Sequence, residues 1–390
     1  MKYITRTIWV LSVVSLLQDM SSELLYPVMP LFLKSIGFSV VLIGLLEGLA
    51  EATIGLSKGY FGKRSDITGK RLPFVQWGYG LSTVGKTLMV LIPHPVWVFL
   101  TRTMDRLGKG IRTGARDAML SDEATPETKG KIFGFHRSMD TVGAVIGPIL
   151  ALLYLHFYPE DYRTLFLLAF LPGMLAVVMT FVLRDKPHEV KVASRGGGFF
   201  SFIGYWKESP AEYRKVVIGF LVFALFNSSD FFLILKLKDS GLNDTQVIGA
   251  YILYNLVYAV FAFPLGILAD RIGLRWTYVF GVAVFASVYF GMSMEAGSAV
   301  YIILFAAYGL YAAATEGIAK AWISNLAGKA QTATAIGLFS GMQSICAVLA
   351  SSLTGVVWYA FGAKVAFMAT AVAATGVMGY FLVLRVSSSR

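Results

Sequence analysis

The chain consists of long apolar segments separated by short polar ones. Twelve such segments can be placed by their hydropathy, at 7–34, 39–60, 72–92, 95–118, 132–156, 163–183, 215–236, 245–266, 276–294, 298–322, 333–358 and 363–384. Each is long enough to cross the ~30 Å hydrocarbon core of a bilayer as an α-helix. The pattern therefore predicts an all-α integral membrane protein with twelve transmembrane helices.

A polar stretch at 185–214 interrupts the series after the sixth apolar segment. It is rich in glycine and basic residues, with Arg195-Gly196-Gly197-Gly198 at its centre. Clusters of this kind between regular segments are typical of loops and linkers. We therefore expect an N-terminal six-helix bundle at 1–184, a cytoplasmic linker at 185–214 and a C-terminal six-helix bundle at 215–390.

One loop motif, G-x-x-x-D-x-x-G, occurs in both halves of the chain. The first copy is Gly62-x-x-x-Asp66-x-x-Gly69, closed by Lys70 and Arg71, and the second is Gly266-x-x-x-Asp270-Arg271-x-Gly273, closed by Arg275. The two aspartates are 204 residues apart (270 − 66), and Leu33-Lys34-x-x-Gly37 returns at the same offset as Leu237-Lys238-x-x-Gly241. A repeat at fixed spacing indicates a duplicated unit. Two repeated halves in a membrane protein indicate a transporter.

Composition and charge agree with this interpretation. Apolar residues make up 56% of the chain and charged residues 15%, against roughly 25% in a soluble domain. The net charge of +11 does not predict nucleic-acid binding, because the cations gather in alternate loops, which sets orientation in a membrane. We expect a multi-pass protein of the inner (plasma) membrane with both termini cytoplasmic, in contact with lipid. With Cys346 the single cysteine and four scattered histidines, we expect no metal site and no cofactor.

The repeated loop motif resembles the signature of the major facilitator superfamily, found between the second and third helices and echoed between the eighth and ninth. Gly143-x-x-x-Gly147-Pro148 is similar to the Gly-Pro motif of its antiporter-type members, although Ala151 and Leu152 replace the usual small pair. Arg102 matches an arginine of those members, whereas Asp105-Arg106 stands where Gln-Gly is usual. The resemblance implies two pseudo-symmetric bundles that rock about a central site lined by helices 1, 4, 7 and 10.

The fourth apolar segment carries six charged residues at three- or four-residue steps, which places them on one helical face. They are Arg102, Asp105, Arg106, Lys109, Arg112 and Arg116. Charges inside a membrane cost roughly 2.5–3.5 kcal/mol each and usually mark a solute or ion path. The alternatives are that some are structural ion pairs, or that this helix ends early and Arg112 and Arg116 reach solvent from a loop.

Other apolar segments offer charges that could complete such a path. They are Asp19, Glu23, Glu47, Glu51, Arg137, Asp140, Asp230, Glu316 and Lys320, with Tyr26 beside Glu23. Asp19 and Glu23 are one helical turn apart and so share a face. We expect them to form the carboxylate side of the central site, opposite the cations of the fourth segment, and to exchange the coupling proton. The alternative is a static ion pair that fastens the two helices together.

The loop motifs are predicted to act as a cytoplasmic gate. Glycines permit a tight turn and close helix approach, and Asp66 or Asp270 could face the N-terminus of a neighbouring helix or pair with arginines of helix 4. Lys70 and Arg71 could reach Asp117 or Asp122. We expect at least one salt bridge between Asp66, Lys70 or Arg71 and the set Arg112, Arg116 and Asp117 when the protein is closed inward. The alternative is an ordinary positively charged loop.

Gly80-x-x-x-x-Gly85-Lys86-Thr87 fits the phosphate-binding pattern G-x-x-x-x-G-K-[ST]. That pattern needs a loop that exposes backbone N–H groups, whereas here it falls within an apolar helix. We therefore interpret it as coincidental and expect Lys86 to be a buried cation paired with the second helix.

Together these features predict a secondary active transporter that moves a small organic solute by alternating access, with proton-coupled efflux as the predicted direction. Proton-coupled uptake of an organic anion or nutrient is the alternative, since helix 4 is net positive. A non-transporting sensor or scaffold is a third possibility, against which the intramembrane carboxylates argue. We expect no enzymatic activity and a monomer. The sequence names no substrate.

Overall fold

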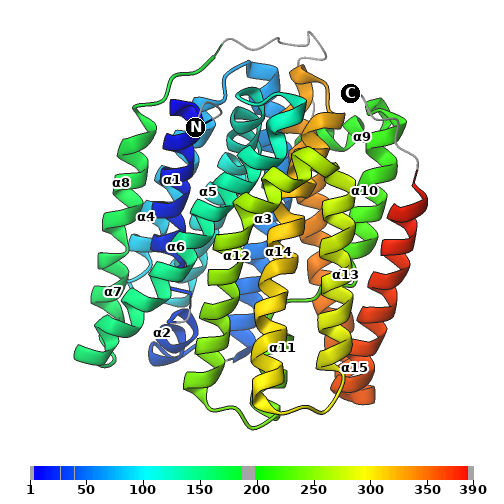
Figure 1. The fold of residues 1–390 in the computed structure, drawn as a ribbon. Coiled ribbons are helices and arrows are strands. Elements are labelled where there is room, and N and C mark those ends of the chain that lie inside the picture. The colour runs from blue at the N-terminus through cyan, green and yellow to red at the C-terminus, as the bar shows by residue number, and fades with distance from the viewer. Residues whose placement is uncertain (1–3, 27, 39, 187–197, 385–390) are drawn as a thin grey trace. The chain divides into compact units, whose positions relative to one another are not determined.

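The computed structural model describes residues 4–26, 28–38, 40–186 and 198–384, and every regular element in these ranges is a helix (Figure 1). The first half contains α1 (Arg6–Glu23), α2 (Met29–Ser35), α3 (Val40–Thr68), α4 (Leu72–Leu88), α5 (Pro95–Asp122), η1 (Pro126–Thr128), α6 (Lys129–Phe157), α7 (Tyr162–Leu168) and α8 (Phe170–Thr180). The second contains η2 (Phe199–Gly204), α9 (Tyr205–Glu208), α10 (Ala211–Ala224), α11 (Phe231–Asp239), α12 (Asp244–Ile272), α13 (Leu274–Met292), α14 (Ser298–Leu326), η3 (Lys329–Gln331) and α15 (Thr332–Val383).

These helices correspond in order to the twelve predicted segments. The first, sixth and seventh segments are each divided into two helices, α1 with α2, α7 with α8, and α10 with α11. The last two segments form α15, which is interrupted at Gly362, where φ is 84° and ψ is 166°. Among the described residues, six helical stretches are long and apolar enough to cross a membrane by composition alone, and α3 and α5 are not among them. The charges carried by α5 explain its lower hydropathy.

The helices group into two compact units, and each unit takes one segment from the other half of the chain. Unit 1 comprises 1–123, 139–208 and 327–344, and unit 2 comprises 124–138, 209–326 and 345–390. The start of α15 therefore belongs with α1–α5, and the start of α6 belongs with α10–α14. These two exchanged segments are where the repeated loop motifs make their contacts.

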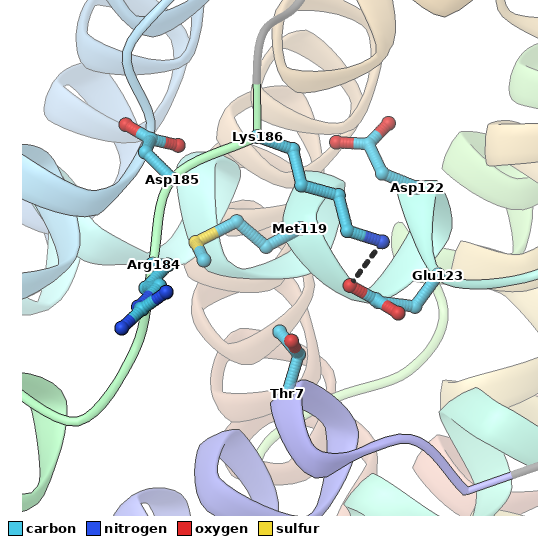
Figure 2. Close-up of a pocket in the computed structure, with 7 residues that line it drawn as sticks. All are labelled: Thr7, Met119, Asp122, Glu123, Arg184, Asp185 and Lys186. Atoms are coloured by element: carbon cyan, nitrogen blue, oxygen red, sulfur yellow. Dashed lines mark ion pairs between the residues drawn. The ribbon is translucent and has the colours of Figure 1, made fainter.

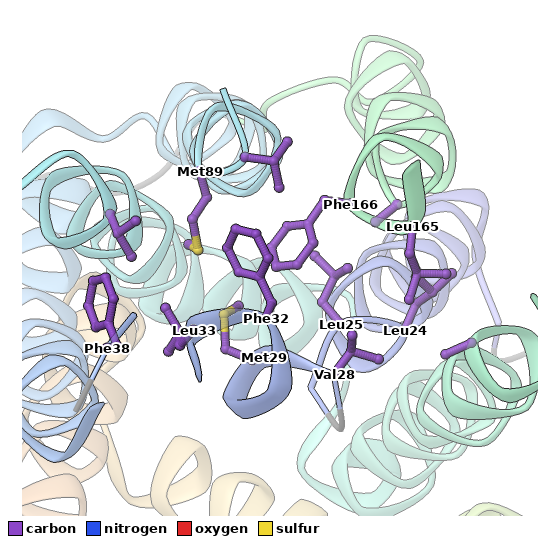
Figure 3. Packing of buried hydrophobic residues seen from close by; sticks show 14 of the residues in the cluster. Leu24, Leu25, Val28, Met29, Phe32, Leu33, Phe38, Met89, Leu165 and Phe166 are labelled. Atoms are coloured by element: carbon purple, nitrogen blue, oxygen red, sulfur yellow. The ribbon is translucent and has the colours of Figure 1, made fainter. Parts of the chain in front are cut away.

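An apolar cluster of unit 1 lies where α2 and α7 meet the end of α1 (Figure 3). Leu25, Leu33 and Phe166 are fully buried there, and the rings of Phe32 and Phe166 are 4.8 Å apart. Isolated helices of seven residues are marginal in stability, so it is this packing that stabilises α2.

The core of unit 2 is built from aromatic side chains of α10, α13, α14 and α15. The Phe285 ring lies 4.7 Å from Tyr311 and 4.3 Å from Tyr289, and Phe220 contacts both Tyr278 and Phe381. Large rings bury 150–250 Å² each, so such a cluster can hold several helices together. Its tyrosine hydroxyl groups also bring polar atoms into an otherwise apolar interior.

Candidate functional site

The carboxylate of Asp66, near the end of α3, caps the start of α15. Its oxygens accept hydrogen bonds from the backbone N–H of Ala333 (3.3 Å) and Thr334 (2.6 Å) and from the Thr334 hydroxyl (2.6 Å). The first N–H groups of a helix have no intrahelical partner, and the helix dipole favours a negative charge there. Asp66 is buried, so the contact is shielded from water.

Asp270, at the corresponding position of the second motif, caps the start of α6. Its oxygens accept hydrogen bonds from the backbone N–H of Gly130 (2.8 Å) and Lys131 (3.0 Å). The two copies of the motif therefore make the same type of contact, each with the first turn of a helix from an exchanged segment. Of the two arrangements left open for these carboxylates, the helix N-terminus is the one both adopt.

The motif glycines make these contacts sterically possible. Gly69 and Gly273 have φ of 63° and 102°, in the left-handed region that favours glycine, and they turn the chain between α3 and α4 and between α12 and α13. A Cβ atom on Gly62 would overlap the carbonyl oxygen of Ala333, and one on Gly266 would overlap that of Gly130. At both of these contacts, Gly62 against Ala333 and Gly266 against Gly130, the helix backbones therefore pack directly on each other.

Arg71 links the first motif to the end of α5. Its Nε is 3.0 Å from an oxygen of Asp122, and its Nη2 is 3.6 Å from Asp66. Asp185, at the start of the linker, accepts hydrogen bonds from the backbone N–H of Arg71 (2.9 Å) and Leu72 (3.1 Å) and so caps α4. Lys70 is exposed.

Asp66 lies beyond the apolar segment 39–60, and its surroundings act on its protonation in opposite directions. Burial raises the pKa of Asp66 to about 6, while the Arg71 guanidinium and the hydrogen bonds from Thr334 and Ala333 favour the ionised form. The burial effect is the largest. Movement of this carboxylate into water would therefore release a proton at mildly acidic pH.

Arg112 and Arg116 are buried in unit 1 and do not reach solvent from a loop, because α5 continues to Asp122. Arg112 donates to the Ser82 hydroxyl (2.8 Å) and lies 4.5 Å from the centre of the Tyr79 ring. Arg116 pairs with Asp117 at 2.9 Å. Arg71 reaches Asp122, one of the two carboxylates expected for it, and also contacts Asp66. The expected salt bridge between the first motif and Arg112, Arg116 or Asp117 stays a prediction.

A second chain of contacts joins Arg116 to α1 and α6. Arg116 Nη1 donates to the Ser15 hydroxyl (3.1 Å), and that hydroxyl donates to Asp140 on α6. All three side chains are buried. Arg112 and Arg116 are thus hydrogen-bonded directly to α4 and α1, and through the Ser15 hydroxyl to α6.

The upper part of the same face contains its own counter-charge. Asp105 lies 3.6 Å from Arg102 and 3.8 Å from Arg106, and all three belong to α5. Lys109, one turn further, is exposed. The exposed Lys109 therefore lies between the Asp105 cluster and the buried Arg112 and Arg116 on the same face of α5.

Asp19 and Glu23 face this charged region. The charges that act on Asp19 are those of Asp140, Lys109, Glu23 and Arg112. Those that act on Glu23 include Lys109 and Arg106. Unit 1 thus brings together the carboxylates of α1 and the cations of α5. Tyr26 lies beyond the end of α1 and is exposed.

Lys86 is buried in α4, and its ammonium donates to the hydroxyls of Ser21 (3.0 Å) and Ser22 (2.9 Å) on α1. The expected pairing with a group of the second helix stays a prediction. The segment Gly80–Thr87 is helical, so its N–H groups are not available to phosphate. Glu51, on α3, is exposed, and the side chain of Glu47 lies outside the residues that the structure describes.

Unit 2 holds the remaining candidate charges. Arg137 of α6 forms an ion pair with Glu316 of α14, and its guanidinium lies 5.8 Å from the centre of the Tyr258 ring. Lys320, one turn after Glu316, is half-buried. Asp230, between α10 and α11, accepts a hydrogen bond from the Tyr308 hydroxyl (2.8 Å). Sequence reasoning did not find Tyr308 or Asn227, which donates to Tyr311 (2.8 Å).

Glycines and an arginine of the remaining motifs act in packing. Gly143 and Gly147 let α6 approach α1, since a Cβ on Gly147 would lie 2.7 Å from the Leu24 nitrogen. Pro148 is accommodated inside α6. Arg275 donates from Nε to the carbonyl of Phe381 (2.6 Å) near the end of α15, and Arg271 is exposed.

Unit 1 also contains a small hollow at the end that carries the start of the linker (Figure 2). Its wall includes Thr7 and Met119, with the Lys186 ammonium 2.7 Å from Glu123. Both signs of charge line the hollow, and Lys186 and Glu123 form an ion pair there. We interpret the hollow as part of the contact that anchors the linker to α5, not as a solute site.

These features define a multi-pass helical membrane protein with a duplicated, interlocking loop motif. The chain belongs to the Major Facilitator Superfamily, whose model matches residues 11–252 and 216–390. Its relatives include an uncharacterized MFS-type transporter of Methanocaldococcus jannaschii, which is 33% identical over 361 residues, 91% of this chain and 89% of that protein. The quinolone resistance protein NorA of Staphylococcus aureus is 25% identical over 165 residues, 42% of this chain and 41% of that protein.

Solved structures show the same fold. The crystal structure of the Escherichia coli fucose:proton symporter superimposes with a TM-score of 0.81 at 11% sequence identity and covers 97% of this chain and 98% of that one. The fold is therefore that of a twelve-helix facilitator with two related halves. A protein of this family is a transporter, not an enzyme.

Proposed function

We propose that this secondary transporter exports a small organic solute in exchange for protons, with two six-helix bundles, 1–184 and 215–390, that alternate access to a central site. The paired caps of Asp66 on α15 and Asp270 on α6 carry the proposal. Each rests on a few hydrogen bonds to backbone N–H groups, which water can replace. Such contacts can break and re-form in every cycle, as a gate requires.

The carboxylates of unit 1 supply a route for the coupling proton. Asp19 and Glu23 face the cations of α5, and Asp140 joins them from α6. Because ionisable groups inside a membrane are costly, their concentration here favours a functional path over inert spans. In this proposal Asp19 and Glu23 carry the proton, and the positive charge of Lys109 favours their ionised form.

Efflux is favoured by the similarity to NorA, a quinolone resistance protein, and by the Gly143-x-x-x-Gly147-Pro148 segment. Uptake of an organic anion or nutrient is the second candidate, supported by the excess of cations on α5 and by the fold shared with a fucose:proton symporter. We place the protein in the cell membrane as a monomer, with both termini and the 185–214 linker in the cytoplasm.

Counterflow in proteoliposomes tests this proposal. Purified protein is reconstituted with one unlabelled solute from a panel of organic ions inside, and exchange of the labelled solute is followed with and without a pH gradient. We expect exchange of at least one solute and acceleration of net export by an opposing proton gradient. Solute exchange at the same rate with and without the pH gradient would contradict proton coupling. The absence of any exchange would favour the sensor or scaffold alternative.

A further inference from the structure

The seventh transmembrane segment is interrupted in the middle, between α10 (Ala211–Ala224) and α11 (Phe231–Asp239). Figure 1 shows the two helices as separate elements of unit 2. The intervening sequence is Leu225-Phe226-Asn227-Ser228-Ser229-Asp230. Asn, Ser and Asp favour such breaks because their side chains compete for backbone hydrogen bonds. Discontinuous helices at membrane depth are tolerated where they line a path or a binding site.

Asp230 has no cationic partner among the described residues. The groups that act on its carboxylate are the Tyr308 hydroxyl, which donates at 2.8 Å, and its own backbone. Asp230 precedes α11 but its side chain does not cap that helix. The cation of α11 closest in sequence to this end, Lys236, points elsewhere, with its ammonium 5.7 Å from the centre of the Tyr301 ring.

This isolation contrasts with unit 1, where Asp19, Glu23 and Asp105 each face at least two cations. An ionised carboxylate removed from water without a partner is strongly destabilising. Such a group persists in an evolved membrane protein when a ligand supplies the missing charge. Asp230 is only partly buried, and its neighbour Ser229 is exposed, so a solute can reach this position.

A second polar atom beside Asp230 is also without a partner. Asn227 uses its Nδ2 to donate to the Tyr311 hydroxyl (2.8 Å), but its Oδ1 is buried and accepts no hydrogen bond from any described residue. Asn227 is three residues before Asp230 in the same break. The interruption thus contains two hydrogen-bond acceptors: the Asp230 carboxylate, of which Tyr308 contacts only one oxygen, and Asn227 Oδ1, which accepts no hydrogen bond from a described residue.

Aromatic rings surround these two acceptors. Tyr308, which binds Asp230, has its ring centre 5.2 Å from Tyr311, which binds Asn227, and 5.2 Å from Tyr254. The rings are buried and fix the positions of both hydroxyl groups. Aromatic walls with a few placed polar groups are characteristic of small-molecule sites. They also suit cations, which are attracted to aromatic rings.

From this arrangement we infer that the break at 225–230 is the subsite for the ammonium group of a protonated organic amine, bound by Asp230 and Asn227 Oδ1 beside Tyr308 and Tyr311. The inference rests on the proposed transport function and specifies its solute class. The positive charge of the amine would neutralise the Asp230 carboxylate, and its N–H groups would donate to Asn227 Oδ1, which has no donor among the described residues. An organic anion would instead be repelled by Asp230 and would leave both acceptors unsatisfied.

Binding to the purified full-length protein in detergent tests the inference. Isothermal titration compares 2-phenylethylammonium with 3-phenylpropionate, which has a similar size but the opposite charge, and with two larger arylalkylammonium ions. We expect at least one ammonium ion to bind and Asp230→Asn to weaken its binding by at least about tenfold, as for loss of a charge-assisted hydrogen bond. Asp239→Asn, at the exposed end of α11, is the matched control and should bind as the wild type does.

Wild-type protein provides a second measurement that does not depend on the folding of a variant. Trimethylated 2-phenylethylammonium keeps the charge but has no N–H donors, so it should bind at least about tenfold more weakly than the protonated amine. Three results would overturn the inference: no ammonium ion binds, Asp230→Asn binds the amine normally, or the trimethylated ion binds equally well.

The binding results separate this inference from the proposed function. If an ammonium ion binds through Asp230 but no solute undergoes counterflow, the subsite stands and the transport proposal fails. If the protein exchanges organic anions and binds no amine, transport stands and the subsite assignment is wrong.

Discussion

The carboxylate of Asp66 accepts hydrogen bonds from both the backbone N–H and the hydroxyl of Thr334, although the two residues are 268 positions apart. This contact joins the end of α3 to the first turn of α15. The matching contact of Asp270 joins α12 to the first turn of α6. Each exchanged segment is therefore held at its N-terminal end by one carboxylate.

Removing the acceptor should separate α15 from α3. In Asp66→Ala, the N–H groups of Ala333 and Thr334 lose their partner, which costs roughly 1–3 kcal/mol while they stay buried. Spin labels at the exposed positions Arg64 and Lys329, in a Cys346→Ser background, report the distance between the two helix ends. We expect a longer distance to become populated in the variant. Thr334→Val, which loses only the hydroxyl bond, should show a smaller change, and an unaltered distribution in both would exclude the cap as a gate.

Mild acidity should favour the Asp66 contact. The pKa of Asp66 is raised to about 6 when buried and would return to its ordinary value of 3.8 in water, so the buried form binds the proton more tightly. The stabilisation is complete below pH 3.8 and is lost as pH rises through 6. Between pH 7.5 and pH 5, the ratio of closed to open forms should rise about tenfold. The same spin labels measure it, and Asp66→Asn, which cannot titrate, should abolish the part of the pH response due to this group.

The close backbone contacts at the motif glycines Gly62 and Gly266 should not tolerate a methyl group. A Cβ on Gly266 would overlap the carbonyl oxygen of Gly130, whereas one on Gly249, also in α12, meets nothing within 4 Å. We expect Gly266→Ala to lower the counterflow rate by about tenfold or more, equivalent to roughly 1.4 kcal/mol. Gly249→Ala serves as the control and should exchange solute normally. Equal rates in the two variants would mean that the close approach is not needed.

The buried arginine network should contribute to folding rather than to gating. Arg116→Ala removes the 2.9 Å ion pair with the buried Asp117, and breaking one side of such a pair costs about 3–5 kcal/mol. Equilibrium unfolding in mixed micelles gives the change in the free energy of unfolding. Arg64→Ala, at an exposed position, should change it by less than about 0.5 kcal/mol. A loss for Arg116→Ala as small as that for Arg64→Ala would show that the network is dispensable.

Hydropathy and the repeat were sufficient to predict the helices, because apolar segments of about 20 residues have few alternatives in a bilayer. They could not identify the partners of Asp66 and Asp270. Spacing places a carboxylate at a helix end, but which helix begins beside it depends on packing between segments far apart in sequence. Lys86 illustrates the same limit, since Ser21 and Ser22 are ordinary helix residues until α1 and α4 are packed together.

The interruption between α10 and α11 was predictable in part. Four of the six residues at 225–230 are Asn, Ser or Asp, which disfavour helix interiors, yet the flanking apolar residues made one continuous span the simpler prediction. The sequence could not predict that Lys236 does not pair with Asp230, because Lys236 follows closely in sequence. Only the structure shows that its ammonium lies beside the Tyr301 ring instead.

The central claim, that the contact between α3 and α15 opens in each transport cycle, is tested most directly by a reversible lock. A Cβ built on Gly55 lies 3.1 Å from the Cβ of Ser344, a few tenths of an ångström less than the roughly 3.5–4.5 Å of a disulfide, so a small backbone shift allows the bond. In a Cys346→Ser background, Gly55→Cys with Ser344→Cys should exchange solute in counterflow when reduced. The account predicts that oxidation stops this exchange and that a reductant restores it. Undiminished exchange by fully cross-linked protein would contradict it.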